Sequence, residues 1–70
     1  MNIAEKIKII MIKRNLTLKE FAEMLNSAPA NLGNKIRRNN FPTNELIEMA
    51  NALNCELSIT FKMKDTGEII

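Results

Sequence analysis

The sequence predicts a small, mainly α-helical domain of four to five helices that ends in a β-strand or hairpin. Apolar residues recur at helical spacing in several segments up to residue 54, and beyond Asn54 the spacing changes to strict alternation. The third observation is size, because 70 residues make one small domain of marginal stability, for which an oligomeric partner is worth seeking. We therefore expect a helical domain over residues 1–54 and a strand or hairpin extension over residues 55–70.

The first helix is expected over roughly residues 2–14. Its apolar stripe, at i, i+4, i+7 and i+8, consists of Ile3, Ile7, Ile10 and Met11. Asn2 is the expected N-cap, and Asn15 is placed to end the helix in the left-handed conformation. Ile9 and Ile12 lie off the stripe, so they are either tolerated surface residues or part of a contact with another chain.

Two short helices joined by a tight turn are expected next, over residues 17–26 and 28–38. Thr17 and Glu20 form a capping box at the start of the first of them. Asn26 supplies the positive φ at the turn, and Pro29 suits the first position of the following helix. The expected core contacts of this pair are Phe21, Ala22, Leu25, Leu32 and Ile36. The pattern predicts a helix-turn-helix.

After a polar loop at residues 39–42, a fourth helix is expected over about residues 43–53. Asn54 is placed to end it in the left-handed conformation, and a half-buried strand follows. The apolar face of the strand carries Cys55, Leu57, Ile59, Phe61 and Met63. A turn at Gly67 would pair Lys64 with Glu68 and Met63 with Ile69. Because an isolated hairpin is marginal in water, it either lies on the helices or pairs with another chain. We expect Leu57, Ile59, Phe61 and Met63 to form a homodimer interface.

Composition argues against an enzyme, a cofactor or a metal site. The chain has no histidine, one cysteine and no Gly-rich phosphate loop, and no motif pairs a nucleophile with a base. No apolar run approaches a membrane span and no signal peptide is evident, which predicts a soluble cytoplasmic protein. The net charge is only +2, but no acidic residue lies between Glu23 and Glu45, where Lys35, Arg37 and Arg38 fall. Such a basic patch is typical of phosphate binding, although it also fits an ordinary solvated surface.

The run Leu16-Thr17…Glu20-Phe21-Ala22-Glu23…Leu25, followed by the turn and Leu32 and Ile36, resembles the lambda-repressor-like, XRE-family helix-turn-helix DNA-binding domains over roughly residues 3–54. The chain departs from that family at Asn26, where Gly is frequent, and at Ser27, where an apolar residue is usual. An Arg–Glu pair that many members bury is matched by two apolar residues, Met11 and Ile36. Replacing both partners together is energetically acceptable.

The resemblance implies that the third helix faces the major groove of double-stranded DNA. The base-reading candidates are Ala30, Asn31, Gly33 and Asn34. Asn34 is the best of them, because Asn can form a bidentate pair with adenine. The phosphate-binding candidates are Lys19, Lys35, Arg37, Arg38 and Asn40. Gly33 is explained either by close approach of the backbone to a partner or by simple tolerance.

The function predicted from these observations is sequence-specific DNA binding by a homodimeric transcriptional regulator. The alternative is a protein-interaction module, such as an antitoxin-like accessory subunit on the same scaffold. The small side chains on the reading face and the Ile9–Ile12 pair favour that alternative.

Overall fold

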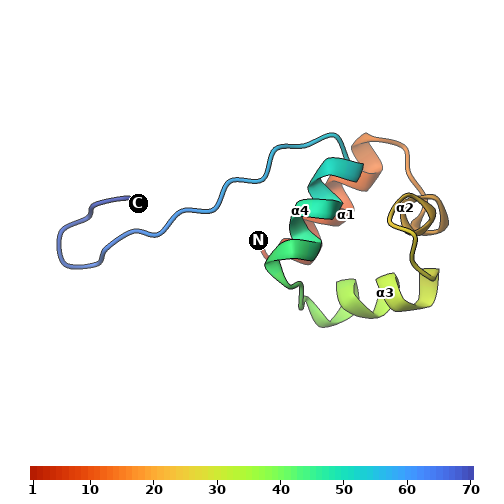
Figure 1. Cartoon of the computed structure of the whole chain (residues 1–70), viewed down its shortest axis with the longest axis horizontal. Coiled ribbons are helices and arrows are strands. Elements are labelled where there is room, and N and C mark those ends of the chain that lie inside the picture. Colours follow the sequence, from red (N-terminus) through yellow and green to blue (C-terminus); the bar gives the residue numbers. More distant parts are fainter.

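The computed structural model describes all 70 residues, and its four helices form a body from which the C-terminal segment projects (Figure 1). The helices are α1 (Ile3–Lys13), α2 (Leu18–Met24), α3 (Pro29–Arg38) and α4 (Thr43–Ala52). The molecule measures 44 × 22 × 20 Å, and the extension accounts for its elongation. The prediction of a mainly α-helical bundle is confirmed, with four helices. None of them has the length and apolarity required to cross a membrane.

The helices begin where the sequence places capping residues. The Asn2 side chain accepts a hydrogen bond from the Glu5 N–H at 2.8 Å. At α2 both halves of the capping box are present: Thr17 Oγ1 accepts from the Glu20 N–H at 3.1 Å, and Glu20 Oε1 accepts from the Thr17 N–H at 3.0 Å. Pro29 opens α3, where its missing N–H leaves no partner unsatisfied.

Every helix is followed by an asparagine in the left-handed conformation. Asn15, Asn26, Asn39 and Asn54 have φ of 55°, 58°, 52° and 56°. At each end two N–H groups bond back to the last turn, as Asn26 N–H to Glu23 and Ser27 N–H to Ala22 do after α2. This is the Schellman arrangement, in which Asn is the common substitute for Gly. The prediction is confirmed for Asn15, Asn26 and Asn54. Asn39, which we assigned to a polar loop, is the fourth member.

The core lies between the four helices. Phe21 and Leu32 are its largest fully buried side chains, and Ala22 is buried with no exposure. The remaining core residues are Ala4, Ile7, Met11, Ile36, Met49, Ala50 and Leu53. Met11 and Ile36 are thus both buried, as expected of an apolar replacement for a buried ion pair. Leu16, Leu25 and Leu46 pack against this core while remaining partly exposed.

Two side chains link segments that are far apart in sequence. Asn39 Oδ1 accepts a hydrogen bond from the Ala4 N–H at 2.9 Å, which attaches the end of α3 to the first turn of α1. Arg14 donates from Nε to the Leu53 carbonyl at 3.1 Å and from Nη2 to the Asn54 carbonyl at 3.2 Å. Arg14 therefore satisfies carbonyls at the end of α4 that have no intrahelical partner.

The extension contains a short hairpin in place of the expected continuous strand. Phe61 and Ile70 exchange two backbone hydrogen bonds, at 3.1 and 2.8 Å, whereas residues 56–60 make none. Lys62 lies opposite Ile69, so the predicted pairing of Met63 with Ile69 is wrong by one residue. The cause is a longer turn: the Gly67 N–H bonds to the Met63 carbonyl at 2.8 Å, which places Lys64 inside the turn. Gly67 has the expected positive φ, 77°.

Candidate nucleic-acid interface

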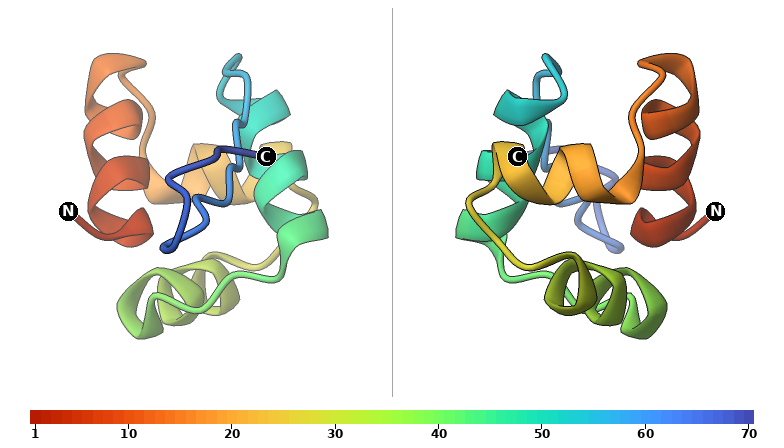
Figure 2. Two further views of the ribbon diagram at one scale, coloured as in Figure 1. Left: turned by 90° about the vertical axis from the view of Figure 1, so that its left-hand side faces the viewer. Right: turned by 90° about the vertical axis from the view of Figure 1, so that its right-hand side faces the viewer.

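The α2–turn–α3 unit places α3 on one side of the body, crossing beneath the other helices in the views of Figure 2. Its start is fixed to α2 through the turn at Asn26, and its end is fixed to α1 through Asn39. Ser27 is half-buried, and its hydroxyl donates to the Ala28 carbonyl at 3.4 Å. Held at both ends, α3 presents one face to the core and the opposite face to solvent.

The solvent face of α3 carries most of the predicted base-reading residues. Leu32 and Ile36 point into the core, and Ala30, Asn31 and Asn34 are exposed. By the 3.6-residue period, Asn34 lies at the centre of the exposed face. These three residues are therefore accessible to a ligand that approaches α3 from outside.

Gly33 lies to one side of that face and is half-buried. A Cβ atom at this position would lie 3.4 Å from Leu18 Cδ2, an ordinary van der Waals contact. Packing alone therefore does not require glycine here. Gly33, Leu18, Lys8 and Arg37 line a shallow open depression between α1, α2 and α3.

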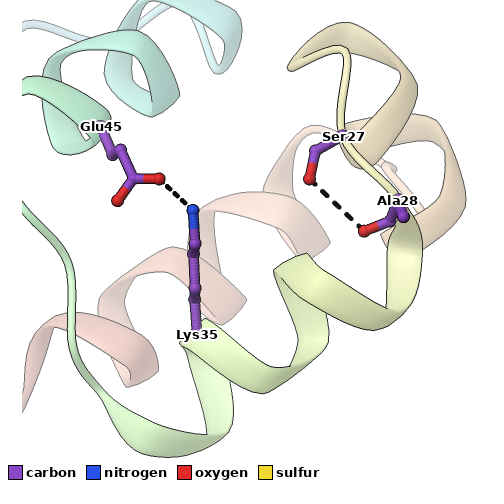
Figure 3. A network of polar contacts seen from close by, with 4 residues as sticks. All are labelled: Ser27, Ala28, Lys35 and Glu45. Carbon is purple, nitrogen blue, oxygen red and sulfur yellow. Dashed lines mark hydrogen bonds and ion pairs between the residues drawn. The ribbon is translucent and has the colours of Figure 1, made fainter.

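The cations of α3 divide into two groups. Arg37 and Arg38 are exposed and form no ion pair with a carboxylate. Lys35 instead points towards α4, where its Nζ forms an ion pair with Glu45 (Figure 3). The phosphate role predicted for Lys35 would have to compete with this ion pair, which the sequence analysis did not foresee. Two cations are left on the outer side of α3.

Two further phosphate-binding candidates flank the helix. Lys19 is exposed in the first turn of α2, and Asn40 is exposed just beyond the end of α3. The first turn of α2 also holds Glu20, whose carboxyl pKa is lowered by the hydrogen bond from the Thr17 backbone N–H and then by that from the Thr17 hydroxyl. A carboxylate at this position partly offsets the attraction of the α2 N-terminus for a phosphate.

Arg37 and Asn34 are in contact on the exposed face. The Arg37 Nη2 donates a hydrogen bond to Asn34 Oδ1 at 3.0 Å, between residues one turn apart. Two polar residues make structural contacts that the sequence did not predict: Asn39 bonds the Ala4 N–H, and Arg14 bonds the carbonyls at the end of α4. The only sequence signal for Asn39 is its position, which matches the other three asparagines that follow helices.

The residues predicted to form a dimer interface all lie in the extension and are exposed to different extents. Leu57 is 41% exposed, Ile59 55%, Phe61 75% and Met63 40%. Leu57 and Ile59 also border an open apolar groove between α1 and α4, whose other lining includes Ile3, Ile7, Ile10, Leu46, Met49 and Leu53. Leu57 and Ile59 thus belong both to the alternating pattern and to the lining of the groove.

A four-helix body with a tight α2–α3 turn and an exposed, basic-flanked α3 defines a small helix-turn-helix domain. A family model for the Cro/C1-type HTH DNA-binding domain matches residues 6–58, and the chain belongs to this family. No curated protein and no solved structure gives a significant match to the chain. The resemblance to lambda-repressor-like, XRE-family domains is thereby confirmed, and the protein belongs to the class of DNA-binding regulators.

Proposed function

We propose that this protein is a sequence-specific transcriptional regulator of the cytoplasm that binds DNA as a homodimer, with α3 of each copy in the major groove. The observation that carries the proposal is the exposed face of α3. There Ala30, Asn31 and Asn34 lie beside two cations, Arg37 and Arg38, that no carboxylate neutralises. Small and amide side chains can reach base edges, while cations alongside them fix the helix against the phosphates.

The division of roles follows from these positions. Ala30, Asn31, Gly33 and Asn34 contact bases, with Ala30 suited to a thymine methyl group. Lys19, Arg38 and Asn40 contact phosphates around the groove, with Arg37 alongside. Lys35 joins them when a phosphate replaces Glu45 as its partner.

The salt dependence of DNA binding tests the proposal. We expect affinity for a mixed pool of duplexes to fall steeply with salt, and the double variant Arg37→Gln/Arg38→Gln to bind at least about tenfold more weakly. The slope of log affinity against log salt should fall by roughly 0.9 for each phosphate contact removed. Lys62→Gln/Lys64→Gln, with the same change of charge in the extension, serves as the control and should change binding only slightly. Equal effects of the two double variants would contradict the assignment to α3.

The homodimer part of the proposal is supported by the extension. Its apolar side chains at the predicted interface remain 40–75% exposed, and the backbone of residues 56–60 has no hydrogen-bonding partner. An exposed edge of this kind is a template for pairing with another chain. A second copy paired along residues 56–60 would cover both the edge and the adjacent α1–α4 groove. Twofold symmetry would then place two α3 helices in successive major grooves, about 34 Å apart.

Sedimentation equilibrium tests the dimer. Phe61→Asp should shift the protein to monomer, because the substitution places a charge on the apolar face. Thr60→Asp adds the same charge on the opposite face of the same segment and should leave the dimer intact. Deleting residues 56–70 should likewise give a folded monomer, and a truncated protein that remains a dimer would refute this interface.

The alternative, a protein-interaction module, is favoured by exposed apolar residues on the outer face of α1. Ile12 is 75% exposed and Ile9 is 37% exposed. The salt titration separates the two functions. Absence of DNA binding at low salt, together with loss of partner binding in Ile12→Lys, would establish the alternative.

A further inference from the structure

The hydrogen bond between Arg37 and Asn34 joins a base-reading candidate to a cation on the same face of α3. Its length is 3.0 Å, its donor is the Arg37 Nη2 and its acceptor is Asn34 Oδ1. A contact between a charged donor and an amide oxygen is stronger than one between neutral groups. It gains further strength where a DNA groove excludes water from it.

The contact changes what Asn34 offers to a base pair. A bidentate Asn–adenine pair uses the amide oxygen as acceptor for the adenine amino group and the amide nitrogen as donor to N7. With Oδ1 turned towards the guanidinium, the group left to face the groove is the Nδ2 amino group, which is a donor. An adenine amino group brought to the same oxygen would also approach a positively charged donor.

Arg37 presents more donors on the same side. Its guanidinium has five N–H groups and no acceptor, and no carboxylate pairs with it. Gly33 lies one turn before Arg37 and lines the same depression, so this position adds no side chain between Arg37 and an approaching base edge. Asn34 and Arg37 together form a surface of donors with one positive charge.

We propose that Asn34 and Arg37 act as a single unit that selects guanine in each half-site. In the major groove guanine presents two acceptors, N7 and O6, whereas adenine presents one acceptor and one donor. Arg37 thus has a specificity role in addition to any phosphate contact, and it orients the amide of Asn34. The inference rests on the proposed function, and it replaces the adenine pairing that the sequence alone suggests for Asn34.

Selection from random duplex DNA with the full-length protein tests the unit. We expect a guanine in each half-site whose enrichment is lost in Asn34→Ala. Arg37→Lys retains the charge but holds the amide less well, since a lysine lacks the planar fork. This variant should bind DNA within a few-fold of the parent, while the preference for guanine over adenine at that position falls from on the order of tenfold to near unity. Arg38→Lys is the matched control and should leave the preference unchanged.

The outcomes are distinguishable. Adenine at the position that depends on Asn34, or a guanine preference that survives Arg37→Lys, would overturn the unit while leaving DNA binding intact. A selected sequence that does not change in Asn34→Ala would overturn it as well. If the parent protein binds no duplex at low salt, the proposed function fails and the unit fails with it.

Discussion

The helical body, residues 1–54, and the C-terminal extension, residues 55–70, use apolar residues in opposite ways. All ten buried residues lie in the body, whereas Leu57, Ile59, Phe61, Met63, Ile69 and Ile70 are exposed in the extension. In the body, each helix has a capped N-terminus or a C-terminus followed by a left-handed asparagine. Two long-range side-chain hydrogen bonds also connect its segments. The extension has one short hairpin. An apolar pattern therefore builds a buried core in the body, whereas in the extension it leaves its side chains exposed.

The largest expected effect contrasts two phenylalanines. Phe21 is fully buried and Phe61 is 75% exposed. Phe21→Ala should cost about 3–5 kcal/mol, because it removes buried apolar surface and leaves a cavity. That is a large fraction of the free energy of unfolding of a small domain. Phe61→Ala should leave the unfolding of the monomer nearly unchanged. Denaturant titrations followed by circular dichroism at low protein concentration measure both. Similar losses would mean that the extension shares the core of the body.

A second contrast separates two asparagines within the body. Both Asn15 and Asn39 have positive φ, but only Asn39 also bonds the Ala4 N–H. Asn15→Gly should be neutral or stabilising by up to about 1 kcal/mol, since Gly adopts this conformation without a steric penalty. Asn39→Gly loses a hydrogen bond worth about 0.5–1.5 kcal/mol and should be the less stable variant. Thermal unfolding of the two variants measures the difference. Equal melting temperatures would show that the link to α1 contributes nothing.

The third contrast concerns pH. The folded-state pKa of Glu20 lies below its ordinary value of 4.5, owing to its hydrogen bonds with Thr17. A depressed folded-state pKa stabilises the protein at pH values above the unfolded-state pKa, and this stabilisation is lost as pH falls through the folded-state pKa. The melting temperature should thus decrease on acidification below about pH 4.5, and less steeply in Glu20→Gln. Glu68→Gln in the hairpin is the control and should follow the parent. An identical acid dependence in all three proteins would contradict a role for the capping box.

The smallest contrast uses the two glycines. Gly33→Ala should stabilise the body by up to about 1 kcal/mol, because Ala favours the helix and the new methyl group meets Leu18 at ordinary contact distance. Gly67→Ala is strained by the positive φ, but it should leave the unfolding of the body unchanged and loosen only the hairpin. Denaturant midpoints give both values. If Gly33→Ala raises stability and lowers DNA affinity, close approach to DNA explains this glycine; unchanged affinity would favour simple tolerance.

The local features of the fold could be predicted from the sequence. The capping box at Thr17, Pro29 at the start of α3 and the left-handed Asn26 are each specified by residues within one turn. The face of α3 that carries Asn34 followed from the positions of Leu32 and Ile36. Such features depend on spacing alone, which the sequence contains in full.

The features that were missed depend on residues brought together by folding. The link from Asn39 to Ala4 spans 35 positions and that from Arg14 to Leu53 spans 39. The ion pair of Lys35 with Glu45 depends on how α4 packs beside α3. The hairpin register differs from the predicted one by one residue, because the Gly67 N–H bonds to the Met63 carbonyl and this bond sets the length of the turn. These hydrogen bonds, the ion pair and the hairpin register do not follow from the local periodicity of the sequence, so sequence patterns could not predict them.

The attachment of α3 at both ends has a consequence for how this protein can diversify. Because Asn26 fixes one end and Asn39 the other, the residues between them that face solvent contribute little to holding the helices together. Under the proposed function, amino-acid substitutions at positions 30, 31 and 34 would alter DNA recognition while leaving the scaffold intact. Descendants of one ancestral chain can in this way acquire new targets without passing through unfolded intermediates, and the same three positions are the natural starting library for directed evolution.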